Sequence, residues 1–145
     1  MPLEYRIDRE RRVVFATAAR TLSDEDVLAY QREVRAHSDL AGYDQIVDLS
    51  QVEDLVLPSG DRVRALAELS SAMDVSGASS KVAIVAPQDL AYGLARMFET
   101  HRTLNQRGSK VMSVFRSMQA ALDWLRAAGS DAPSGGGPPE PSARS

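Results

Sequence analysis

Two kinds of hydrophobic pattern alternate along most of this chain, and this alternation constrains the fold more than any other feature. Short runs rich in β-branched and apolar residues, typical of strands, are separated by longer stretches whose apolar residues recur at helical spacing. The run KVAIVA at 81–86 is apolar in nearly every position, which predicts a central strand covered on both faces. Strands that alternate with helices pair in parallel through right-handed crossovers, so we expect an α/β fold.

The first two strands depart from this parallel pattern. Leu3, Tyr5 and Ile7 alternate with polar residues, and the run VVFATAA follows after a charged turn at 9–12. Two strands joined so tightly pair as an antiparallel hairpin. We therefore predict a mixed sheet of about five strands, an N-terminal antiparallel hairpin followed by parallel strands, with four helices. The expected strands are residues 3–8, 13–19, 45–49, 81–86 and 111–115.

Serine marks the start of the first and last predicted helices. Ser23 is followed by Asp26 at the spacing of a capping box, and Leu22 and Val27 are spaced as a hydrophobic staple. Ser117 is placed to cap the last helix. The residues expected on inner helix faces are Val27, Tyr30 and Val34; Val63, Leu66, Leu69 and Met73 in the helix 58–73; Leu90, Leu94, Met97, Phe98, His101 and Leu104 in the helix 88–105; and Leu122 and Leu125.

Composition excludes several functional classes. A chain of 145 residues is long enough for one domain with a core and too short for two. The absence of cysteine excludes disulfides, thiolate metal sites and cysteine nucleophiles. A net charge of −3 argues against nucleic-acid binding, which favours a basic excess. The N-terminal segment is charged and no apolar run reaches about 20 residues, so we expect a cytoplasmic protein without a membrane span.

The last residues of the chain differ in composition from the rest. The segment GSDAPSGGGPPEPSARS contains no large apolar side chain, so it cannot offset the entropy lost on ordering. We expect one domain at 1–128 and a disordered tail at 129–145. A proline-rich docking peptide around Pro138, Pro139 and Pro141 is the alternative for the tail.

The order of strands and helices, with IVDLSQVEDL and SGDRVRAL in its middle, resembles the STAS fold of sporulation anti-sigma-factor antagonists. The segments VAPQDLAYGLARMFE at 85–99 and VFRSMQAALDWL at 114–125 are similar, more closely, to the SpoIIAA-like, or STAS/Sec14-like, bacterial proteins of uncharacterised function. The resemblance implies a non-catalytic interaction module that binds a protein partner. Because Sec14-like proteins hold lipids between sheet and helices, it also implies an alternative, a small carrier of an apolar or lipid-like ligand.

The first candidate site is the turn that opens the helix 58–73. In the antagonist family a serine at the comparable turn is phosphorylated, and the phosphate switches partner binding. Ser59 and Gly60 are retained here, whereas the acid and the second serine of the family pattern are missing. The resemblance implies a partner surface at Ser59, Gly60 and Arg62, with Ser59 as candidate phosphoacceptor. The plainer interpretation, which we favour, is that Ser59 caps the helix.

Tyr92, Gly93 and Arg96 form a second candidate site, for a ligand. Glycine within a helix costs about 1 kcal/mol relative to alanine, so Gly93, with Ala95 nearby, indicates a close approach by another element or by a ligand. Arg96 is suited to an anionic head group or a partner carboxylate. The alternative is a tightly packed helix face with Arg96 in a salt bridge.

No catalytic residue, metal site or cofactor is predicted. His37 and His101 belong to no metal or triad motif, and no nucleophile, base and orienting group occur together, so we do not expect an enzyme. The acids Asp48, Glu53 and Asp54 follow the third strand, where open α/β sheets commonly bind ligands, but we expect a solvated loop there.

The methionines leave two interpretations open. Met73, Met97 and Met112 occupy core-like positions, where they either line an adaptable apolar pocket or fill gaps in the core. A sizeable closed pocket would favour the carrier, whereas a flat surface around Ser59 and Arg62 would favour the interaction module. The sequence is compatible with a homo-oligomer.

Overall fold

The five strands lie in the sheet in the order in which they occur in the chain. The computed structural model describes residues 3–56, 60–72, 79–104 and 109–127. The strands are β1 (Leu3–Asp8), β2 (Val13–Ser23), β3 (Asp44–Val56), β4 (Ser79–Val85) and β5 (Ser109–Phe115). β1 pairs antiparallel with β2, and the other neighbours pair in parallel, which confirms the predicted mixed α/β sheet. The predicted tail at 129–145 lies outside the described residues.

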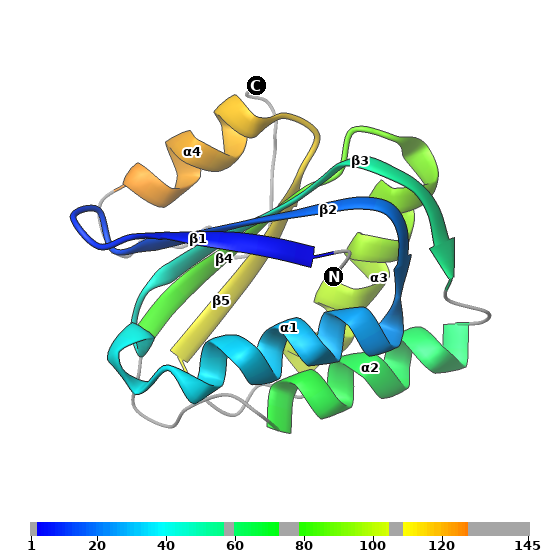
Figure 1. Ribbon diagram of the computed structural model, residues 1–145. Helices are drawn as coiled ribbons and strands as arrows, with labels where there is room; N and C mark the ends of the chain where they lie inside the picture. Colours follow the sequence, from blue (N-terminus) through cyan, green and yellow to red (C-terminus); the bar gives the residue numbers. More distant parts are fainter. Residues whose placement is uncertain (1–2, 57–59, 73–78, 105–108, 128–145) are drawn as a thin grey trace.

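Three helices cover one face of the sheet and a fourth covers the other (Figure 1). The first three are α1 (Asp24–Ala36), α2 (Gly60–Ala72) and α3 (Asp89–Leu104), a short 3-10 turn η1 (Ser38–Leu40) follows α1, and α4 (Met118–Arg126) lies on the opposite face. The parallel strands advance in one direction across the sheet, so right-handed crossovers place α1, α2 and α3 together. None of the described helices is long and apolar enough to cross a membrane.

β4 is buried on both faces, as its apolar run predicted. Val82 and Ile84 belong to the core under α1, α2 and α3. Ala83 and Val85 belong to a second, smaller core that includes Ala121 of α4. A strand buried between two helical layers needs apolar residues at every position, which is why alternation is absent from this run.

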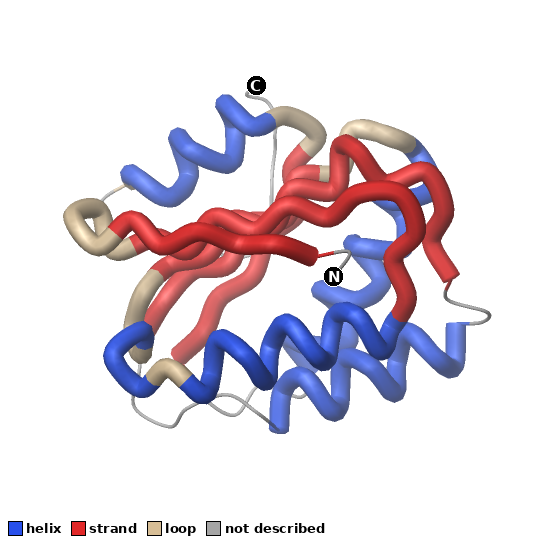
Figure 2. The backbone as a smooth tube through the Cα atoms, in the orientation of Figure 1, coloured by secondary structure: helices blue, strands red, loops and turns tan. Residues whose placement is uncertain are grey.

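β2 and β3 are longer than predicted, and they bend. Instead of ending near Leu49 and giving way to a loop, β3 continues to Val56, so Glu53 and Asp54 lie on a strand. The β2–β3 pairing contains register shifts after Thr17 and after Arg20, and Arg20 has a φ of 65°. Such bulges bend a strand pair, and Figure 2 shows both strands turning toward the helices at this end. Sequence patterns missed this extension because its polar residues lie on a partly exposed ribbon.

The inner faces of α2 and α3 differ in part from the prediction. Leu69 of α2 is 54% exposed, and on α3 Leu90 is 68% and Met97 38% exposed. The buried residues of α3 are Ala91, Ala95, Phe98 and Arg102. Leu94 and Phe98 face inward as predicted. Leu90 and Met97 do not, and the small side chains of Ala91 and Ala95 pack inward beside the predicted positions instead.

The start of α1 agrees with its predicted capping box. The Ser23 hydroxyl accepts a hydrogen bond from the backbone N–H of Asp26 at 3.2 Å, and the Asp26 carboxylate accepts one from the backbone N–H of Ser23 at 3.0 Å. Each side chain thus satisfies a donor that the helix itself leaves unpaired. This fixes the point at which the bent end of β2 turns into α1.

We expect Ser23→Ala to lower the free energy of unfolding by about 1 kcal/mol, because the amide of Asp26 loses its acceptor. Chemical denaturation of Ser23→Ala, Asp26→Ala and the double variant measures this effect. The double variant should lose less than the sum of the two single losses, since both act on one reciprocal pair. Strictly additive losses would contradict the capping box.

Candidate functional site

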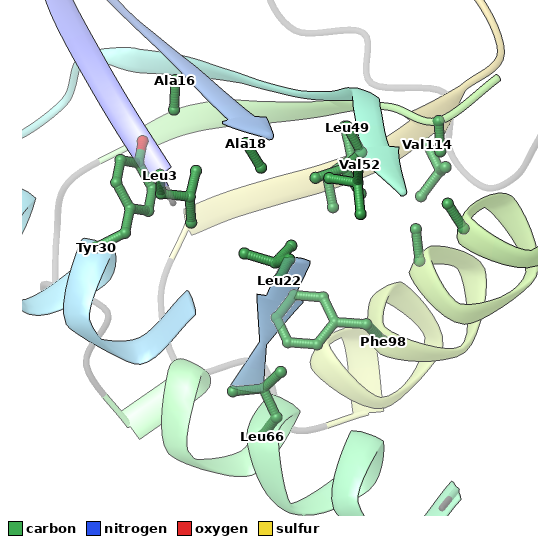
Figure 3. Packing of buried hydrophobic residues seen from close by; sticks show 14 of the residues in the cluster. Leu3, Ala16, Ala18, Leu22, Tyr30, Leu49, Val52, Leu66, Phe98 and Val114 are labelled. Atoms are coloured by element: carbon green, nitrogen blue, oxygen red, sulfur yellow. The ribbon is translucent and has the colours of Figure 1, made fainter. Parts of the chain in front are cut away.

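A cavity lies between the sheet and the layer formed by α1, α2 and α3. Its volume is about 290 Å³, near the lower end of the range of small-molecule sites. Leu22 from β2, Leu66 from α2 and Phe98 from α3 converge on this space, and Leu49 approaches from the sheet (Figure 3). The cavity therefore has apolar walls contributed by every element that encloses it.

Helix α2 creates this cavity because it packs on its neighbouring helices rather than on the sheet. Its main contacts are with α3 and α1, and it lies farther from the strands than those helices do (Figure 1). On α3 the residues that face inward include Ala91 and Ala95, whose small side chains leave space open. Most protein cores are close-packed, so a void of this size calls for an explanation.

The polar residues of the cavity gather at one end. Gln31 and Arg35 lie in the second half of α1, Ser80 is the second residue of β4, and Arg102 lies in the last turn of α3. Both helices run back toward the amino-terminal edge of the parallel strands, so these groups share that edge. Leu22 and Leu55, which face each other in the β2–β3 pairing, lie at the opposite, carboxyl-terminal end. The cavity is thus polar at one end and apolar at the other.

Two neighbouring residues of α1 show how the polar end is built. The Tyr30 hydroxyl donates a hydrogen bond to Oε1 of Gln45 at 2.8 Å, and burial raises the pKa of Tyr30, which keeps this hydroxyl a neutral donor. Oε1 of Gln31 is buried and accepts no hydrogen bond from the part of the chain that the structure describes. An unsatisfied buried polar group costs roughly 1–3 kcal/mol, so Gln31 is a group that a bound molecule can satisfy.

The predicted partner surface at the start of α2 is only partly described. Ser59 lies outside the described residues, so its cap and phosphoacceptor roles both stay predictions, whereas Gly60 is the first residue of α2. Arg62 forms a salt bridge with Asp24, the first residue of α1. This pair ties the starts of the two helices together, so the Arg62 guanidinium has a structural role within the chain.

The second predicted site lies on the outer part of α3, away from the cavity lining. Gly93 is exposed, and a Cβ built there would meet no atom of the described chain within 4 Å, so the predicted close approach is absent from these residues. Arg96 pairs with Glu99 at 3.2 Å, as the alternative interpretation expected. Tyr92 lies under the guanidinium of Arg116, which is 4.1 Å from the ring centroid. Ligand binding by this group stays a prediction.

The structure also shows where several other candidate residues lie. Met112 lines the cavity, as one interpretation expected, whereas Met73 lies outside the described residues. His101 is half-buried on α3, and Asp48 accepts a hydrogen bond from the backbone N–H of Ser50. Among the residues described, no group of His, Cys, Asp and Glu is arranged to hold a metal ion.

The polar end of the cavity was not predicted from the sequence. Its most buried member, Arg102, continues the spacing of Ala91, Ala95 and Phe98 along α3. An arginine on the same face as small and aromatic residues was the available signal. This signal was missed because the large apolar residues Leu90 and Met97 were assigned to the inner face, although both are exposed.

Comparison with known proteins gives one match to report. No protein-family model and no curated protein sequence matches this chain. The chain is similar to the crystal structure of an uncharacterized protein from the DUF3478 family with a SpoIIAA-like fold, from Shewanella loihica PV-4. The match has 20% sequence identity and a TM-score of 0.49, and it covers 85% of this chain and 91% of that one. The fold assignment here rests on strand order and connections, and the match says nothing about function.

We expect Gly93→Ala to stabilise the isolated protein by about 0.5–1 kcal/mol, because alanine favours the helix and open space surrounds the site. Thermal unfolding should show a rise of a few degrees. Gly42→Ala is the matched control: Gly42 has a φ of +87°, so alanine should destabilise there. A lower melting temperature for Gly93→Ala would show that Gly93 packs closely against something.

Proposed function

We propose that this protein is a non-catalytic binding protein that holds a small, largely apolar molecule between its sheet and its helical layer. The observation that carries this proposal is the 290 Å³ cavity lined by side chains from the strands and from α1, α2 and α3. Apolar surface that a ligand buries there contributes about 25 cal/mol per Å² of favourable free energy. The cavity thus favours the carrier over the interaction module.

The size of the cavity sets the scale of the ligand and of its affinity. Small ligands gain roughly 0.3–1.5 kcal/mol per non-hydrogen atom, with the smallest ligands at the upper end. A molecule of about ten such atoms would therefore bind with a dissociation constant on the order of micromolar. Affinity in this range suits a carrier or sensor that exchanges its ligand.

An interaction module for a protein partner is the second candidate. It is supported by the outer face of α3, where Leu90, Gly93 and Met97 are exposed at helical spacing. Large apolar residues gathered on one exposed face are typical of interaction surfaces. The two functions are compatible, because this face lies outside the cavity lining.

The carrier proposal is tested with N-phenyl-1-naphthylamine, a neutral probe whose fluorescence rises in apolar sites. We expect saturable binding by the wild type and at least about a tenfold weaker affinity for the Ala91→Leu/Ala95→Leu variant, because the added methyl groups occupy the cavity. Ala65→Leu is the control for each single leucine substitution, since Ala65 is exposed on α2 and leucine there adds the same atoms outside the cavity.

Circular dichroism and thermal unfolding of the variants confirm that they are folded. Absence of saturable binding by the wild type would contradict the proposal. So would unchanged affinity in a folded double variant. If the double variant unfolds, each single leucine variant replaces it, and the loss of affinity should again exceed that of Ala65→Leu.

A further inference from the structure

Along β4, the side chains that face the cavity change from polar to apolar. Ser80, Val82 and Ile84 all line the cavity, and their spacing of two residues places them on one face of the strand. Ser80 is the second residue of β4, at the amino-terminal edge of the parallel strands, whereas Ile84 lies near the opposite end. A molecule that lies along this strand therefore meets a hydroxyl at one end and apolar side chains along the rest of its length.

The Ser80 hydroxyl has no partner in the part of the chain that the structure describes. Ser80 is 9% exposed, and its Oγ makes no hydrogen bond with any described residue. A hydroxyl carries one donor and two acceptor lone pairs, and buried polar groups are nearly always hydrogen-bonded. Because Ser80 lines the cavity, a molecule inside the cavity is placed to supply the missing hydrogen bond.

Gln45 of β3 adds a second hydrogen-bonding group beside Ser80. Gln45 lies opposite Val82 in the parallel pairing of β3 and β4, so Ser80, two residues before Val82, is its diagonal neighbour on the same face. Gln45 also lines the cavity, and its Oε1 accepts a hydrogen bond from the buried Tyr30 hydroxyl at 2.8 Å. Since Tyr30 engages this oxygen, the amide nitrogen of Gln45 is the group that remains to donate.

These two groups suit an uncharged oxygen. A carbonyl oxygen accepts hydrogen bonds from a hydroxyl and from an amide, and an alcohol both donates and accepts. Burial of an ionised group instead requires a paired charge. Among the cations of the described lining, Arg102 has interactions within the chain, and Arg35 and His37 are exposed.

We propose that Ser80 and Gln45 form a polar subsite for a hydroxyl or carbonyl oxygen, and that the molecule held in the cavity is an uncharged amphiphile whose oxygen lies at this subsite. This inference rests on the proposed function and specifies its ligand class. The apolar body lies along Val82 and Ile84 and extends toward Leu55 at the carboxyl-terminal end of the parallel strands.

The test is isothermal titration with four probes that share a four-carbon chain on a phenyl ring: butylbenzene, 4-phenylbutan-1-ol, 4-phenylbutan-2-one and the anion 4-phenylbutanoate. The first three differ in whether they carry no oxygen, a hydroxyl or a carbonyl. The anion is included because Lys110 is the partner of Ser80 in the register of β4 and β5. Because each probe is compared between wild type and variant, differences between probes in transfer from water cancel.

Ser80→Ala should weaken binding of the alcohol, the ketone or both by about fivefold or more, because the ligand oxygen loses a partner. Its affinity for butylbenzene should stay within about twofold of the wild type. Ser113→Ala is the matched control and should change neither: Ser113 lies on the neighbouring strand β5, pairs with Ala83 on the face covered by α4, and does not line the cavity.

Ser80→Ala should fold, because the hydroxyl that it removes has no partner in the described chain, and circular dichroism checks this. If it does not fold, Ser80→Cys takes its place. A thiol is a weak donor and a weak acceptor, so this variant should weaken binding of the oxygen-bearing probes in the same direction.

Unchanged affinity of the folded variant for both the alcohol and the ketone would overturn this inference and leave the proposed function standing. So would an equal loss of affinity for butylbenzene, tighter binding of the anion than of the alcohol and the ketone, or binding of butylbenzene alone. Failure of all four probes and of N-phenyl-1-naphthylamine to bind would instead contradict the proposed function itself.

Discussion

The rest of the structure depends on how helix α2 is supported. α2 lies on α1 and α3 rather than on the strands, and the salt bridge between Arg62 and Asp24 ties its start to the start of α1. The bent ends of β2 and β3 lead the chain away from the plane of the sheet to the helical layer, since α1 begins directly after β2 ends at Ser23. A helical layer supported in this way leaves room between itself and the sheet.

The two faces of the sheet are used differently. Between α4 and the sheet, Ala121 of α4 packs with Ala83 and Val85 of β4 in a small core. On the other face, the same sheet forms one wall of the cavity, and its opposite walls come from three helices. Deleting buried atoms costs about 24 cal/mol for each Å³ of cavity left behind, so an apolar occupant would stabilise this face. We infer that stability and ligand binding are coupled in this protein.

The fold could be predicted because its signals are local. The apolar run of β4 and the capping box at Ser23 each specify an element within a few residues, and the strand–helix alternation determines how the elements connect. The cavity could not be predicted, because its volume depends on the height of α2 above the sheet. Arg102 and Gln31 are far apart in the sequence, and both line the cavity only because α3 and α1 cover the same face of the sheet. The bulges that bend β2 and β3 likewise depend on pairing between distant residues.

Methyl NMR with a bound apolar probe tests the central claim most directly, because it locates the ligand within the fold. The protein would carry labelled methyl groups on Ile, Leu and Val, and the probe would be decan-1-ol. The account predicts intermolecular NOEs from the probe to Leu66, Val82 and Ile84, which line the cavity. It predicts none to Leu122 and Leu125, which belong to α4 on the opposite face of the sheet. NOEs confined to the α4 side, or to exposed Leu90 alone, would contradict it.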